Sequence, residues 1–187
     1  MTVPQPDFPG GRSAVRRAVD LLDVLLPEPP DPAQVLEVLV AHGEPDEPLA
    51  AADLAELHAA ALELREAFAA PDTAAAAKVL NRLFAKYASP PRLSAHDADF
   101  GWHLHVDAAD DGPWGAWFVT SSSLALAGLL AERQGPPGGL CASPSCGRPF
   151  AHLGGGSPRR YCSTRCATRE RVAAHRAKTK TGSGSAV

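Results

Sequence analysis

The chain has no run of the ~18 apolar residues that a membrane-spanning helix needs, and its most apolar stretch, residues 21–26, contains Asp23. The first residues have neither the basic nor the apolar segment of a secretory signal. Hydrophobic residues make up 45% and charged residues 21% of the 187, which is ordinary globular usage. We therefore expect a soluble, cytoplasmic protein with no membrane partner.

Recognisable catalytic motifs are also absent. Ser121, Ser122 and Ser123 lack the G-x-S-x-G context of a nucleophile and are interpreted as a helix cap. Residues 154–156 are glycines without the lysine or the strand-to-helix setting of a phosphate loop. We therefore expect no enzymatic activity.

Charge is divided unevenly along the chain. Residues 141–187 carry nine Lys or Arg and one acidic residue, a net charge of +8, and the first 140 residues carry −11. This division favours two modules with different partners. A basic end commonly binds polyanions, and it can also be a solubilising tail.

Several stretches have the apolar spacing of amphipathic helices. The first begins at Ser13, a candidate N-cap, and ends at residue 26. The second follows Asp31 and Pro32 and stops at Gly43. Two more are predicted over residues 49–70 and from the cap residue Asp72 to the residues before Pro90, and another over residues 122–134.

Residues 102–106 alternate apolar and polar, as a half-buried strand does. Turn residues follow at 110–112, so residues 114–119 are predicted as the returning strand of a β-hairpin. Trp102, Leu104 and Val106 would then face the core, and the histidines between them would face solvent. The less favoured alternative is a second metal or hydrolytic site formed by His103, His105, Asp97, Asp99 and Asp107.

All four cysteines lie in one short segment, as a Cys-x4-Cys pair, a fifteen-residue spacer and a Cys-x3-Cys pair. In a reducing cytosol, paired cysteines favour a metal over disulfides, and four thiolates suit one tetrahedral structural Zn²⁺. The predicted ligands are Cys141, Cys146, Cys162 and Cys166. Four reduced core cysteines are disfavoured because the segment has few other apolar residues, and His152 is a weaker substitute ligand.

Arginines gather around the second cysteine pair and along the helix predicted after it. Such a surface can enter a DNA groove or follow phosphates, or it can be a solvated basic helix without a ligand. The predicted nucleic-acid contacts are Arg159, Arg160, Arg165, Arg169, Arg171 and Arg176.

Residues 140–146, Phe150 and residues 159–169 together resemble the CGNR zinc finger. That finger is found at the C-terminus of bacterial proteins with an ABATE domain, described as stress-induced transcription regulators. Residues 64–67 (Leu-Arg-Glu-Ala) and residues 80–81 (Leu-Asn) are similar to a pattern in the ABATE helices. The chain departs from the finger's pattern at Ala167 and Thr168, in place of Gly-Asn, and at Tyr161 and His152.

Arg65 and Asn81 lie on or near apolar helical faces, where a polar side chain needs a partner. They are interpreted either as a hydrogen-bonded pair between helices or as the floor of a small ligand pocket. The resemblance favours the pocket.

The predicted architecture is mainly α, with one β-hairpin in an N-terminal domain and a small treble-clef-like zinc finger. Its parts are a flexible arm (1–12), a helical domain (13–134), a linker (135–139), the finger (140–178) and a disordered tail (179–187). The predicted function is DNA-binding transcriptional regulation, with the helical domain sensing a small-molecule effector or forming a homodimer. The alternative is a zinc-stabilised adaptor that docks its basic face on a protein.

Overall fold

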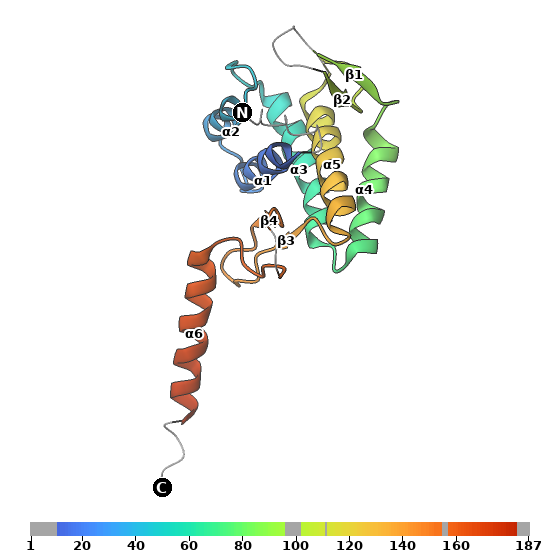
Figure 1. Cartoon of the computed structure of the whole chain (residues 1–187). Helices are drawn as coiled ribbons and strands as arrows, with labels where there is room; N and C mark the ends of the chain where they lie inside the picture. The colour runs from blue at the N-terminus through green and yellow to red at the C-terminus, as the bar shows by residue number, and fades with distance from the viewer. Residues whose placement is uncertain (1–10, 96–101, 111, 155–156, 183–187) are drawn as a thin grey trace, which may run out of the picture.

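The computed structural model describes residues 11–95, 102–110, 112–154 and 157–182, with side chains described up to residue 177 (Figure 1). Most of the predicted arm, and residues 183–187 of the predicted tail, fall outside these ranges. Residues 179–182 of that tail belong to a helix instead.

The predicted mainly helical fold is confirmed. Five helices form a bundle: α1 (Arg12–Leu25), α2 (Pro32–Ala41), α3 (Ala51–Ala69), α4 (Thr73–Tyr87) and α5 (Trp114–Arg133). Helix α5 packs against α1, α3 and α4, so it forms the centre of the bundle (Figure 1). The core includes the fully buried side chains of Leu22, Leu64, Phe68, Phe118 and Leu126.

Local capping chemistry sets several helix boundaries. The Asp31 carboxylate accepts a hydrogen bond from the Ala33 amide at 3.0 Å, and Asp72 accepts one from Ala75 at 2.8 Å. Gly43 follows α2 with φ +88°, a left-handed conformation that glycine adopts without strain. The cap predicted at Ser13 is wrong: Gly11 is the N-cap of α1, and no side chain caps that helix.

The returning strand predicted over residues 114–119 is wrong, because these residues form the first turns of α5. Several of these residues are aromatic or β-branched and have strand propensity. They nevertheless form one continuous apolar segment with the residues that follow. Trp114 and Trp117 contact edge to face one turn apart, and the Thr120 hydroxyl donates to the Ala116 carbonyl at 2.7 Å. The serines predicted as a helix cap therefore lie inside α5, where Ser122 and Ser123 are buried.

The hairpin exists, with a different partner strand and without the clear inward and outward sides that were predicted. Strand β1 (Arg92–Ser94) pairs antiparallel with β2 (His103–His105), and Leu93 lies opposite Leu104. Leu93 and Trp102 are 66% and 77% exposed, and the His105 side chain is only 12% exposed. Trp102 therefore lies outside the core, whereas Val106 is buried as predicted, and His105 contacts Asp107 rather than facing solvent.

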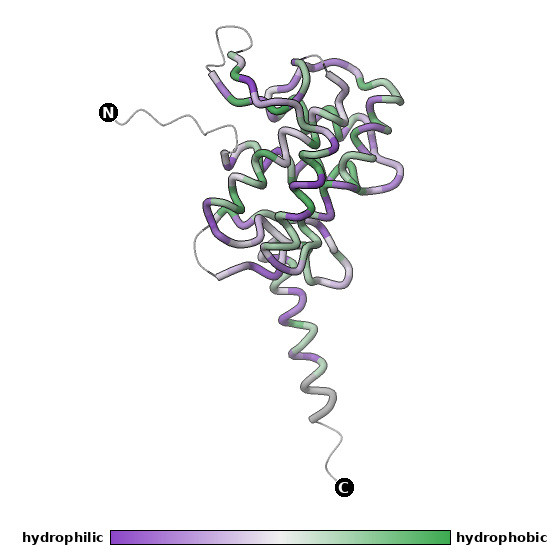
Figure 2. Tube along the Cα trace, turned by 90° about the vertical axis from the view of Figure 1, so that its right-hand side faces the viewer, coloured by the Kyte–Doolittle hydropathy of each residue, from purple (hydrophilic) through white to green (hydrophobic). Residues whose placement is uncertain are grey.

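A second antiparallel hairpin, β3 (Gly138–Leu140) with β4 (Pro149–Ala151), precedes the last helix, α6 (Thr164–Gly182). Strand β4 contacts α1 and α3, and Ala151 joins the hydrophobic core of the bundle. Gly138 and Gly139 of the predicted linker are therefore part of β3. Figures 1 and 2 show α6 projecting away from the rest of the molecule.

Helix α5 is long and apolar enough to cross a membrane, by length and composition alone. This length is hidden in the sequence because residues 114–119 have the pattern of a strand and only the residues after them have that of a helix. Half of the stretch is buried within the protein, which is the usual state of a core helix.

Candidate metal centre

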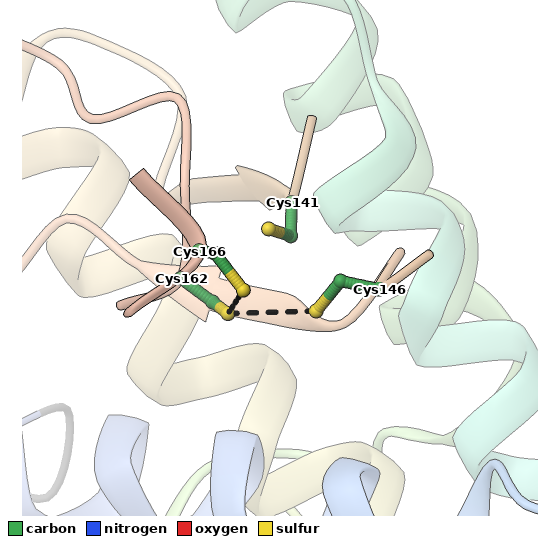
Figure 3. Close-up of side chains that lie close together, drawn as sticks. All are labelled: Cys141, Cys146, Cys162 and Cys166. Carbon is green, nitrogen blue, oxygen red and sulfur yellow. Dashed lines mark hydrogen bonds between the residues drawn. The ribbon is translucent and has the colours of Figure 1, made fainter. Parts of the chain in front are cut away.

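The side chains of the four cysteines converge on one point (Figure 3). Cys141 directly follows β3, Cys146 ends the turn after it, Cys162 precedes α6, and Cys166 lies in the first turn of α6. The turn is tight because the Cys146 amide donates to the Ser143 carbonyl at 2.9 Å, and Gly147 follows it with φ +63°. Ser163 caps α6, since its hydroxyl accepts from the Cys166 amide at 3.3 Å.

The sulfurs have the spacing of a tetrahedral zinc site. All four thiols are free, and their Sγ atoms lie within 4.8 Å of one another. Cys162 Sγ is 3.6 Å from Cys146 Sγ and 3.8 Å from Cys166 Sγ. Four sulfurs about 2.3 Å from one central ion would be separated by about 3.8 Å. The cluster therefore fits one structural zinc ion, as the sequence predicts.

The thiols do not ionise equally. Burial raises the pKa of Cys141, but amide donors from Cys162 and Ser143 and neighbouring thiols outweigh it and lower that pKa to about 7. Burial and the neighbouring Cys146 and Cys141 raise the pKa of Cys162 to about 12. Crowded thiols resist losing a second proton because their negative charges repel. A bound zinc ion supplies the positive charge that lets all four exist as thiolates.

Arg169 belongs to this centre. Its Nη2 lies 3.5 Å from Cys166 Sγ and donates to the Ser143 hydroxyl at 2.7 Å. That hydroxyl in turn donates to Glu170 at 2.5 Å, and Glu170 lies 3.5 Å from Arg169 Nε. The arginine thus holds the turn that carries the first cysteine pair against the helix that carries the last ligand. Its guanidinium also offsets part of the negative charge of the thiolates.

Ser143 and Glu170 were missed by the sequence analysis. Ser143 is 1% exposed although it lies in a surface turn, and its burial is explained by these hydrogen bonds. The one available signal was that Glu170 is the sole acidic residue among residues 141–187.

The comparisons with known proteins agree with this geometry. The fold and the four-thiol cluster define a zinc-binding protein with a small finger attached to a helical bundle. Residues 139–179 match the family model of the CGNR zinc finger. No curated protein matches the chain. Ala167 and Thr168 stand where the Cys-Gly-Asn-Arg motif of the family has Gly-Asn. Ala167 is half-buried and Thr168 is exposed on α6, while Cys166 and Arg169 lie in the metal centre.

The other predicted nucleic-acid contacts divide into two groups. Arg159 donates to the Ala151 carbonyl at 2.7 Å and lies over the Phe150 ring, so it also supports the finger. The remaining ones are exposed: Arg160 beside Tyr161, and on α6 Arg165, Arg171 and Arg176.

His152 lies outside the thiol cluster. It is 9% exposed and packs edge to face on Phe150, and burial, with Arg133 and Arg159 nearby, lowers its pKa. A substitute ligand is therefore not required. The histidine packs on Phe150 within the second hairpin, and its amide donates to the Pro137 carbonyl.

The ligand pocket predicted at Arg65 and Asn81 stays a prediction. Asn81 is exposed on α4 and Arg65 is half-buried on α3. A cleft of about 270 Å³ lies elsewhere, between α1 and the finger, with Arg16, Asp20 and Arg148 in its lining. Neither Arg65 nor Asn81 lines it.

Replacing Arg169 is expected to weaken the zinc site. R169A removes the contacts that join Ser143 to Cys166, and residues that orient metal ligands typically account for 10- to 100-fold in metal affinity. Competition with a chromophoric zinc chelator should show that loss. The control is R165A, an exposed arginine one turn earlier. Equal zinc affinity in both variants would contradict the assigned role of Arg169.

Proposed function

We propose that the protein is a cytoplasmic DNA-binding transcriptional regulator whose zinc centre fixes α6 for contact with nucleic acid. The observation that carries the proposal is the projection of α6 beyond the molecule, with its residues from Arg171 to Ala177 all exposed (Figure 2). A 19-residue helix held by one end at a zinc site is long enough to lie in a major groove or along phosphates.

The charge of α6 supports the same proposal. Arg165 and Arg176 share one face of the helix, and Arg171 lies on the neighbouring face. The one acidic residue of α6, Glu170, is bonded to Ser143 of the finger. The charge presented outward is therefore positive, as phosphate contact requires.

The bundle has a separate role in this proposal. It carries the negative charge of the chain and would sense an effector or form a homodimer, as its resemblance to ABATE helices implies. Strand β4 contacts α1 and α3 and precedes α6 in the chain, so such an event would reach α6 through this strand.

The test is fluorescence anisotropy of the zinc-loaded full chain on its own promoter and on a random duplex pool, across salt concentrations. Six to eight phosphate contacts give a log–log slope of about −5 to −7. Tight promoter binding above the pool, with a shallower slope, would indicate base recognition. Absence of binding even at low salt would overturn the proposal and favour docking on an acidic protein.

Removing the exposed arginines together should identify the contact surface. The variant R165A/R171A/R176A is expected to weaken binding to all duplexes and to make the salt slope shallower by about three. Zinc content should not change, because none of the three is bonded to a cysteine in the part of the chain with described side chains. The matched control R12A/R82A/K86A removes three exposed charges from the bundle. An equal loss in that control would show that only overall charge matters.

A further inference from the structure

The geometry points to a second metal site, on the β1–β2 hairpin, that takes an exchangeable divalent transition-metal ion. We propose that the Nε2 atoms of His103 and His105 bind this ion, with Asp107 positioning His105. The site is separate from the thiol cluster and extends beyond the proposed function.

The two histidines converge at their tips. They stand at alternate positions of β2, so both side chains leave the same face of the hairpin. Their Nε2 atoms are 2.8 Å apart, and the ring centroids are 4.6 Å apart at an angle of 46°. Two nitrogens bonded at about 2.1 Å to one metal are separated by about 3.0 Å at a right angle and by about 3.4 Å in a tetrahedron. The observed spacing therefore fits adjacent ligands of an octahedral or square-planar ion, and imidazole suits nickel or copper.

Asp107 orients the His105 ring. Both carboxylate oxygens of Asp107 lie 3.2 Å from His105 Nδ1, and Asp107 is 8% exposed. An ionised carboxylate only accepts, so the contact with Asp107 favours the neutral His105 tautomer that has its proton on Nδ1 and its lone pair on Nε2. Carboxylate–histidine–metal arrangements of this kind hold ligand imidazoles in many proteins.

Arg92 prevents a metal ion from binding between Asp107 and Asp110, so we place the ion at the tips of the histidines. Its Nη2 donates to Asp107 at 2.7 Å and to Asp110 at 2.6 Å, and these bonds, that to Asp110 foremost, raise its pKa. The space between the two carboxylates is thus filled by a cation. One guanidinium beside two carboxylates leaves a single net negative charge next to the histidines, which favours a metal cation there.

Metal binding needs only a small rearrangement. With His105 in the tautomer that Asp107 favours, the 2.8 Å contact requires the proton between the two Nε2 atoms to belong to His103. When the ion binds, that proton moves to Nδ1 of His103, and the rings separate by a few tenths of an ångström to reach the spacing given above. Two protein ligands leave other positions to water, so the ion should exchange with the medium, unlike zinc in the closed four-thiol site.

The test uses the full zinc-loaded chain without a histidine tag, titrated with nickel chloride in a calorimeter. We expect uptake of one nickel per chain, weakened at least about tenfold in H103Q and in H105Q and about 10- to 100-fold in D107N. A colorimetric indicator monitors zinc release, so that nickel entering the thiol cluster is recognised. Melting curves show whether each variant is folded.

The matched control is H42Q. His42 Nε2 lies 3.0 Å from the Asp20 carboxylate, so it is a histidine–aspartate pair outside the hairpin. Nickel binding should be unchanged in that variant. The proposal is overturned if the zinc-loaded wild type takes up no nickel at millimolar concentration, or if folded H103Q/H105Q takes up as much as wild type.

Discussion

Removal of zinc is expected to unfold the finger and to destabilise the bundle. Zinc binding contributes about 10–16 kcal/mol to the folding of small zinc modules. The three thiols left in C166S cannot replace this stabilisation, and neither can the four protonated thiols of the chelated wild type. Helix α6 is fixed at the cluster by Cys166 and projects away from the bundle, so it should lose its helical structure (Figure 1). The bundle loses support because Ala151 of β4 is part of its core.

Three measurements check this expectation. Elemental analysis should find one zinc per chain in wild type and none in C166S. Far-UV circular dichroism should lose helical signal on chelation and recover it when zinc is returned. The melting temperature of the bundle should fall as well. S145A, a change at an exposed position of the same turn, should keep its zinc. A chelated chain that keeps α6 helical and resistant to protease would contradict a structural role for the metal.

Gly138→Ala is expected to cause the largest loss of stability outside the cysteines. A Cβ atom at Gly138 would overlap the carbonyl oxygen of Phe150 and lie 2.8 Å from Phe68 Cδ1. The first neighbour is paired backbone and the second is a fully buried core ring, so neither can yield cheaply. The expected cost is about 3 kcal/mol or more, which lowers the melting temperature by about 6–12 °C in a chain of this size.

The neighbouring glycine is the matched control. A Cβ at Gly139 would lie 3.3 Å from the tip of the Phe150 ring, a contact that a small ring movement relieves. Gly139→Ala should therefore melt close to wild type. Thermal unfolding of both zinc-loaded variants measures the difference. If the two variants have the same melting temperature, the close packing of β3 between β4 and α3 does not stabilise the protein.

The zinc ligands could be predicted from the sequence because their chemistry is local. Within each cysteine pair the two sulfurs lie close together because the residues are only four or five positions apart. Four such cysteines in one short segment are best explained by a shared metal ion. Helix caps such as Asp31 and Asp72 are equally local, since each carboxylate bonds an amide two or three residues away.

The roles of the arginines could not be predicted in this way. Arg165 and Arg169 occupy the same helical face, yet only Arg169 reaches Ser143, because the turn after β3 lies beside that one position. Contact with a residue 26 positions away depends on how the hairpin meets the helix. The periodicity of α6 contains no information about that meeting.

The helical class, the caps at Asp31 and Asp72, the uneven charge and the four zinc ligands could be predicted from the amino-acid sequence, because each depends on patterns within one short segment of the chain. The tertiary structure decided that residues 114–119 are helical, since burial between α1, α3 and α4 outweighs their strand propensity. It also decided that β2 pairs with β1, which brings His103 and His105 together beside Asp107 and Arg92. Strand pairing and helix packing join residues distant in the chain, and their free energies come from surfaces that do not exist until the chain has folded.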